Sequence, residues 1–236
     1  MTGEPVTGDS VTGGPVTRDS VDGASVTGPG PSVRVPPGDR RSLGPLARLT
    51  AVGAARVTGA TGGEPLRVFT TLGRHRRLFR AWLRFGAALL LRGELPAADR
   101  ELVVLRTAWR CGAWYVWVQH VALASGTGPA ALDLERITAD PEAAGWPRRQ
   151  RLLVRAVDEL VDRHVIGDTT WRGLAGELGE RELIELCLLV GHYEMLAGAL
   201  NSLGVEPEPV AAAGVRGGAA AVSERLRDRL VALRRG

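Results

Sequence analysis

The sequence predicts an all-α protein, and three observations carry that prediction. Apolar residues recur every three or four positions through most of the chain, which is the period of an amphipathic helix. Glycine and proline stand at the ends of these stretches, where they commonly end or begin helices. No segment alternates between apolar and polar residues as a half-buried strand does. With 236 residues, of which 44% are apolar and 24% charged, the chain fits one helical domain with appendages.

The N-terminal segment has a short repeat in place of a helical pattern. From Pro5 the sequence falls into the five-residue units PVTGD, SVTGG, PVTRD, SVDGA and SVTGP, in which valine is the main apolar residue. Such a segment buries too little apolar area to offset the entropy that it would lose on ordering. We therefore predict that residues 1–38 are a disordered tail.

The helical pattern begins after this tail. Residues 39–64 are expected to form short helices and a Gly-rich linker, and residues 65–206 the main helical domain. A strong helix is predicted over residues 74–91 because its apolar positions form one stripe along a helical face. The residues of this expected buried stripe are Leu78, Trp82, Phe85 and Leu89.

The other core helices have similar boundary signals. Pro96, Pro129 and Pro147 each stand at the first turn of an apolar-periodic stretch, and Gly204 follows the last one. The predicted ranges are about 96–110, 114–125, 129–138, 147–163, 168–178 and 179–203. Residues 207–236 are expected to be a linker followed by an amphipathic terminal helix.

The charge pattern argues against nucleic acid and membrane partners. The pI is about 9.9, but the net charge is only +4 and the arginines are interleaved with acidic residues. The dense Arg74–Arg77 cluster is interpreted as a solvated helix start, with contact to an anion as the alternative. The chain has no uncharged apolar run of about 18 residues and no secretory signal pattern. We expect a cytoplasmic protein that binds neither nucleic acid nor a membrane.

The cysteines and histidines do not indicate a metal or a cofactor. Cys111 and Cys187 lie far apart in helical, apolar contexts, so two free thiols are expected, with a disulfide or redox pair as the alternative. No zinc-type Cys/His spacing and no Glu-x-x-His motif of a di-metal site is present. We predict that the protein has no metal and no cofactor.

One acid–histidine pair stands out. Glu101 and His120 lie on two successive predicted helices that are joined near Gly112. A turn there would let the helices pack together, so a carboxylate and an imidazole could meet in an apolar environment. This arrangement is suited to moving a proton.

The segment from about Phe69 to Pro207 resembles the carboxymuconolactone decarboxylase family, which includes the alkylhydroperoxidase D-like (AhpD-like) proteins. The residues that carry the resemblance are FTTLGRHRRLFRAWLRF, LPAADRELVVLRTAWR, YVWVQH and ELIELCLLVGHYEMLAGALNSLGV. The resemblance implies a compact helical bundle that assembles into homo-oligomers, as trimers or hexamers.

The thiol chemistry of the family is not expected here. Its peroxidase members use a Cys-x-x-Cys pair followed by a histidine, with a glutamate on the preceding helix. Glu101 and His120 match the glutamate and the histidine, but the two cysteine positions are Ala113 and Val116. Cys111 is offset by two residues, which turns a helical side chain by about 200° away from the site. Dithiol peroxidase activity is therefore not expected.

The decarboxylase branch does not need those cysteines. The resemblance implies acid–base chemistry on a small organic acid or lactone, with Glu101 and His120 as the catalytic pair. The residues expected to line the substrate pocket are Trp114, Tyr115, Trp117 and His192. His192 could also form a second acid–histidine pair with Glu185, seven residues earlier on the same helix.

Each of these residues also has a structural interpretation: Glu101 could stabilise the helix dipole, and the aromatic residues could simply pack in the core. The sequence thus leaves two main hypotheses. The protein is either an enzyme of this family or a catalytically silent helical oligomer or ligand-binding module. A peroxiredoxin-type hydroperoxide reductase is the further alternative.

Overall fold

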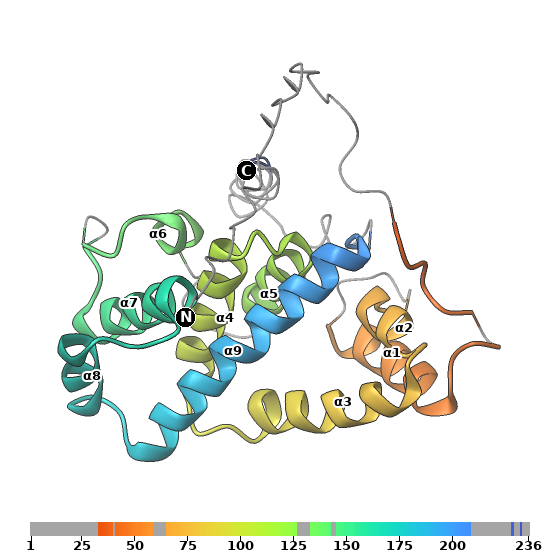
Figure 1. The fold of residues 1–236 in the computed structure, drawn as a ribbon, viewed down its shortest axis with the longest axis horizontal. Coiled ribbons are helices and arrows are strands. Elements are labelled where there is room, and N and C mark those ends of the chain that lie inside the picture. Colours follow the sequence, from red (N-terminus) through yellow and green to blue (C-terminus); the bar gives the residue numbers. More distant parts are fainter. Residues whose placement is uncertain are drawn as a thin grey trace, which may run out of the picture.

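The all-α prediction is confirmed. The computed structural model describes residues 33–39, 41–58, 65–126, 133–142 and 145–208, together with Asp228 and Ala232, and this part of the chain contains helices and no strand (Figure 1). The helices are α1 (Pro45–Thr58), α2 (Arg67–Leu72), α3 (Arg76–Leu91), α4 (Ala97–Arg110), α5 (Trp114–Gly126), α6 (Leu134–Thr138), α7 (Arg148–Arg163), α8 (Asp168–Ala175) and α9 (Glu180–Leu203). The predicted repeat tail up to residue 32, residues 59–64 and nearly all of the predicted terminal helix lie outside the described residues.

Helix α4 is the centre of the bundle. It contacts α5, α6, α7 and α9, and its residues from Leu102 to Trp109 are all buried. In Figure 1, α9 crosses in front of α4 and α5, with α7 and α8 at one end of the molecule and α1, α2 and α3 at the other. A helix that is covered on every side by other helices can hold polar groups away from water, which matters for the site described below.

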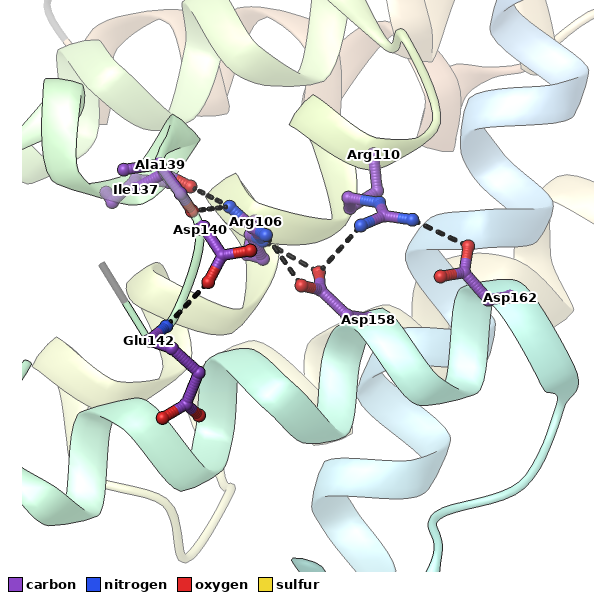
Figure 2. Close-up of polar contacts among 8 residues, drawn as sticks. All are labelled: Arg106, Arg110, Ile137, Ala139, Asp140, Glu142, Asp158 and Asp162. Atoms are coloured by element: carbon purple, nitrogen blue, oxygen red, sulfur yellow. Dashed lines mark hydrogen bonds and ion pairs between the residues drawn. The ribbon is translucent and has the colours of Figure 1, made fainter. Parts of the chain in front are cut away.

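Two arginines of α4 fix this helix to α6 and α7 (Figure 2). Arg106 donates to both carboxylate oxygens of Asp158, at 2.8 and 2.6 Å, and to the carbonyl oxygens of Ile137 and Ala139. Arg110, one turn further on, contacts Asp158 and Asp162. Because the Arg106 side chain is only 4% exposed, its fork of four hydrogen bonds is needed to offset the cost of burying its charge.

The predicted buried stripe of α3 is correct in part, because Leu89 is buried and Trp82 is half-buried. Leu78 and Phe85 are exposed, whereas Phe79, Gly86 and Leu89 are buried. Both stripes have helical spacing, so the apolar period alone could not tell which of them faces the neighbouring helices. The outward stripe of α3 leaves Phe85 at the edge of the bundle, where 40% of it is exposed.

Helix α9 is the longest helix and ends at Gly204, whose φ of 69° is a left-handed conformation that suits glycine. By length and composition α9 is the one described helix that could cross a membrane. Its inner face, however, packs in the core of the bundle and includes the buried polar residues Glu185 and His192. The segment before α1 also contacts the end of α9: the amides of Arg34 and Val35 donate to the Leu203 carbonyl.

Candidate functional site

Glu101 and His120 meet because the chain reverses between α4 and α5. Cys111 ends α4, and Gly112 takes a φ of 59°, a conformation that L side chains rarely adopt. The Ala113 amide then donates back to the Ala108 carbonyl at 2.8 Å, which closes the turn and sends α5 back along α4. Glu101, in the second turn of α4, is thereby placed opposite His120 in the middle of α5.

Glu101, His120 and a third side chain, Tyr193, are joined in a row by hydrogen bonds. Oε2 of Glu101 lies 2.7 Å from Nδ1 of His120, and the hydroxyl of Tyr193 on α9 lies 2.9 Å from Nε2 of the same ring. The side chains of Glu101 and His120 are only 12% and 8% exposed, and Tyr193 is buried. The predicted meeting of carboxylate and imidazole in a water-poor environment is therefore present, with a tyrosine as its third member.

The surroundings of Glu101 and Tyr193 shift the pKa values of both side chains, and these shifts indicate where the protons of the hydrogen-bonded row lie. Burial acts to raise the pKa of Glu101, but the electrostatic attraction and the hydrogen bond of His120, together with the neighbouring Arg100 guanidinium, outweigh it and hold the pKa below its ordinary value. Burial, with the negative charge of Glu101, raises the pKa of Tyr193 well above its ordinary value. With Glu101 ionised and Tyr193 neutral, a neutral imidazole at this position donates from Nδ1–H to Glu101 and accepts at Nε2 from the Tyr193 hydroxyl.

His192 lies beside this chain and is not paired with Glu185. The carboxylate of Glu185 accepts from the amides of Glu94 and Leu95, in the loop before α4. The predicted pair was wrong because seven residues along a helix separate two side chains by about 10 Å, even on one face. His192 instead packs against aromatic rings, and burial, with the charge of His120, lowers its pKa from 6.5 to about 4.

The structure places the predicted aromatic pocket residues at different depths. Trp117 is completely buried and packs against Trp109, and Trp114 is half-buried at the start of α5. The Tyr115 hydroxyl accepts from the Val68 amide and donates to Oε1 of the buried Glu208. The Tyr115 hydroxyl is thus already fully engaged, and the substrate-binding roles of Trp114, Tyr115 and Trp117 stay predictions.

Glu208 organises a second buried polar cluster. Besides Tyr115, it accepts from the side chain of Gln119 and from the amide of Arg67, the first residue of α2. The negative charge therefore lies at the N-terminus of α2, where the helix dipole stabilises it. This cluster fastens the chain that follows α9 to α2 and α5.

Apolar side chains occupy the two positions at which the family's peroxidase members carry thiols. Ala113 and Val116 are both buried core residues, and Cys111 and Cys187 are free thiols rather than a disulfide. Burial, with the negative charge of Glu194, raises the pKa of Cys111 to about 11, so this thiol stays protonated at neutral pH. Among the described residues no group of three His, Cys, Asp or Glu side chains could hold a metal ion.

Comparison with known proteins identifies the family. Residues 76–159 match the carboxymuconolactone decarboxylase family, and similar solved structures have the AhpD core. Residues 76–159 of the chain thus carry the segment that defines the carboxymuconolactone decarboxylase family, and the fold is that of AhpD-like proteins. The matched residues contain both Glu101 and His120, whereas His192 and Tyr193 lie beyond them.

Three solved structures illustrate the shared fold of the family. The AhpD core of a peroxidase-related protein from Ralstonia eutropha JMP134 is 20% identical with a TM-score of 0.67, and the match covers 78% of this chain and 96% of that one. A peroxidase-related protein from Silicibacter sp. TM1040 is 15% identical with a TM-score of 0.61, covering 74% and 93%. The debrominase Bmp8 in complex with 2,3,4-tribromopyrrole is 14% identical with a TM-score of 0.65, covering 77% and 95%. No curated protein matches the sequence.

Two residues of the site region were missed by the sequence analysis, Tyr193 and Glu208. Tyr193 follows His192 directly and faces inward on an apolar helix, where a tyrosine resembles any other core aromatic. Glu208 follows the last core helix in a segment that looks like a linker. Which groups these two reach depends on how helices distant in sequence are packed, and no local pattern carries that information.

Proposed function

We propose that this protein performs acid–base chemistry on a small organic acid or lactone, with His120 as the proton-accepting group and Glu101 as its anionic partner. The observation that carries the proposal is the 2.7 Å contact between Glu101 and His120, with both side chains about nine-tenths buried. A carboxylate at this distance stabilises the imidazolium that forms when the ring takes up a proton. It also leaves Nε2, which contacts the Tyr193 hydroxyl, as the ring nitrogen that takes up the proton.

The reaction needs no redox partner. The imidazole takes a proton from the substrate at one stage and returns a proton to the substrate carbon at a later stage. Removal of a proton next to a carbonyl group and protonation of the carbon that loses a carboxyl group are both steps of this kind. Because Ala113 and Val116 occupy the positions of the family's thiols, acid–base chemistry is the chemistry that the site retains.

A small flat ring is the ligand that we propose for the site. A protein of the same fold, the debrominase Bmp8, has been solved with 2,3,4-tribromopyrrole, which is a small flat ring. The surroundings of His120 in this chain are also aromatic, since Tyr193 packs edge-on against it at 5.2 Å between ring centroids. From this comparison we propose only that the ligand of the present protein is similarly small and flat.

The test is turnover of a carboxymuconolactone by the purified protein. Glu101→Gln and His120→Ala should each lower kcat/KM by at least about a hundredfold, because each removes a partner in the proton transfer. Glu159→Gln is the matched control: its side chain is 16% exposed and hydrogen-bonded, but its partners are Gly167 and Thr170 at the beginning of α8. Equal turnover in all three variants, with unchanged helical circular dichroism, would refute the proposal.

We also propose that the protein forms a homo-oligomer through α9, a property that the silent-scaffold hypothesis shares. Ile184, Leu188 and Met195 are 61%, 48% and 57% exposed, and Gly191 and Gly198 continue the same exposed line along the helix. These positions alternate in spacing between three and four residues, the pattern of a helix–helix seam. A second copy of the chain would cover this stripe.

Multi-angle light scattering tests the assembly. The unchanged protein should elute as one species larger than a monomer, in keeping with the trimer or hexamer expected for the family. Leu188→Glu should dissociate it because a charge cannot be buried unpaired in an apolar seam. Leu49→Glu, at a position on α1 that is 73% exposed, should leave the assembly intact. A monomeric unchanged protein would contradict the oligomer but not the acid–base site.

A further inference from the structure

An aromatic face formed by α3 and α9 adjoins the proposed proton-transfer site. The Trp82 indole stacks on the His192 imidazole, with 6.3 Å between centroids and 11° between planes, and Phe85 meets the same imidazole edge-on at 5.3 Å. Beside the ring lies Gly86, where an added methyl group would meet only Cε1 and Nε2 of His192, at 3.8 Å. The backbone of α3 thus leaves space next to the imidazole, and the 40% exposure of Phe85 opens this face to the surface.

Two polar atoms in this aromatic face lack partners. Nδ1 of His192 and Nε1 of Trp82 are buried and have no hydrogen-bond partner among the described residues. His192 is itself only 4% exposed. Because a buried polar atom without a partner destabilises the fold, two of them on stacked rings call for an occupant that satisfies them. Trp82 can only donate, whereas a neutral imidazole can donate with one nitrogen and accept with the other.

The same face leads to the proton-transfer site through Tyr193. The Tyr193 ring packs edge-on against both His192 and His120, at 5.2 Å in each case. Both nitrogens of His120 are already bonded, Nδ1 to Glu101 and Nε2 to Tyr193. The Tyr193 hydroxyl is therefore the group through which a proton from a ligand at the aromatic face can pass to Nε2 of His120.

We propose that Trp82, Phe85 and His192 bind a planar unsaturated ring that carries a hydroxyl group, and that Tyr193 passes the proton of this hydroxyl to His120. The ligand O–H gives its proton to the Tyr193 oxygen while the Tyr193 proton moves to Nε2 of His120. The products are a ring oxyanion and an imidazolium that Glu101 stabilises, and the total charge does not change. This inference rests on the proposed function because it uses the same Glu101–His120 pair, and it adds the ligand class and the residue that contacts the ligand.

The test uses p-nitrophenol, a flat phenol whose neutral and anionic forms absorb at different wavelengths. The unchanged protein should bind it in calorimetry at a mildly acidic pH and should convert a larger share of the bound dye to the anion than free solution does. His192→Phe, which keeps a ring but removes the nitrogens, and Gly86→Ala, which fills the space beside it, should each weaken binding about tenfold. Trp171→Phe, an exposed aromatic on α8, should bind as the unchanged protein does.

Two further variants separate the roles in proton transfer. Tyr193→Phe should bind the dye within about threefold of the unchanged protein, yet leave the bound dye protonated. Glu101→Gln should likewise bind the dye but form less anion, because the imidazolium loses its partner. Dye that ionises equally in Tyr193→Phe would overturn the role of Tyr193.

The outcomes also distinguish this inference from the proposed function. No binding by the unchanged protein, or binding that is equal in His192→Phe and Gly86→Ala, would overturn the aromatic site even if Glu101-dependent lactone turnover were found. Conversely, dye binding that depends on His192, without any lactone turnover, would support the site and refute the proposed reaction. Because Gly86→Ala favours helix formation, a loss of binding in this variant does not come from unfolding.

Discussion

Burial of a neutral His192 should make the protein sensitive to mild acid. Its pKa is about 4 in the folded chain against 6.5 when unfolded, because burial, with the charge of His120, opposes protonation. Between these values the unfolded chain binds the proton and the folded chain does not, so stability falls as the pH falls through 6.5 toward 4. From about pH 7 to about pH 5 the loss comes to about 2 kcal/mol.

The assay is urea unfolding followed by circular dichroism at the two pH values. His192→Phe should lose about 2 kcal/mol less than the unchanged protein over this interval, since it has no imidazole to protonate. His164→Asn is the matched control: the His164 side chain is 77% exposed and its φ of 58° suits asparagine. The control should keep the full pH dependence.

Glu101 does not confuse this measurement, because its own contribution lies at lower pH. Its folded pKa is below the ordinary value of 4.5, so the stability that it contributes is present above 4.5 and is lost only as the pH falls through the lower folded pKa. If the unchanged protein and His192→Phe lose the same stability between about pH 7 and about pH 5, the buried neutral imidazole is not the cause, and the reasoning fails.

Three further predictions concern the scaffold and the thiols. Asp158→Ala should lower the free energy of unfolding by about 3–5 kcal/mol, because it leaves the buried Arg106 guanidinium without its carboxylate partner. Asp162→Ala, which removes a more exposed carboxylate, should lower it by about 1 kcal/mol or less. Equal losses in urea unfolding would contradict this account of α4. Gly93→Ala should destabilise the protein in thermal unfolding, because a Cβ there would lie 2.1 Å from Oε1 of Glu185. Gly53→Ala should raise stability by up to about 1 kcal/mol, because its Cβ would meet nothing within 4 Å and alanine favours the helix more than glycine does. With a dithiol donor, the protein should not reduce hydroperoxides faster than the protein-free solution does, because the Cys111 thiol has a pKa of about 11. Turnover that disappears in Cys111→Ser would show that this thiol is the nucleophile after all.

Local sequence patterns were sufficient to predict where helices begin and end, but not which face of a helix is buried. The predicted ranges 114–125 and 147–163 differ by a single residue from the observed α5 and α7, because proline and glycine mark these ends directly. The buried face of α3 was partly misassigned because Leu78 and Phe79 begin two competing apolar stripes. Which stripe is covered depends on α1, which packs against Phe79, and on α9, whose His192 lies beside Gly86.

The candidate site divides in the same way. Glu101 and His120 could be paired from the sequence, since they lie on consecutive helices joined by a glycine and match the family's motif. Tyr193 could not be added to them, because it approaches His120 from a helix 73 residues further along the chain. The mistaken Glu185–His192 pair shows the converse error, in which a shared helical face was taken for contact.

The Glu101–His120–Tyr193 chain is hard to explain by stability alone. A buried ionised carboxylate needs partners that offset the loss of hydration, and apolar residues of similar volume commonly serve a core equally well or better. The bundle already gains its cohesion elsewhere, from the apolar faces of α4 and α9 and from the bidentate Arg106–Asp158 pair. Ala113 and Val116 show that apolar side chains fit at the neighbouring positions of α5, so the same packing could have accommodated one at His120. A polar chain that ends beside the unpartnered nitrogens of His192 and Trp82 therefore fits a role in moving a proton better than a role in holding the fold together.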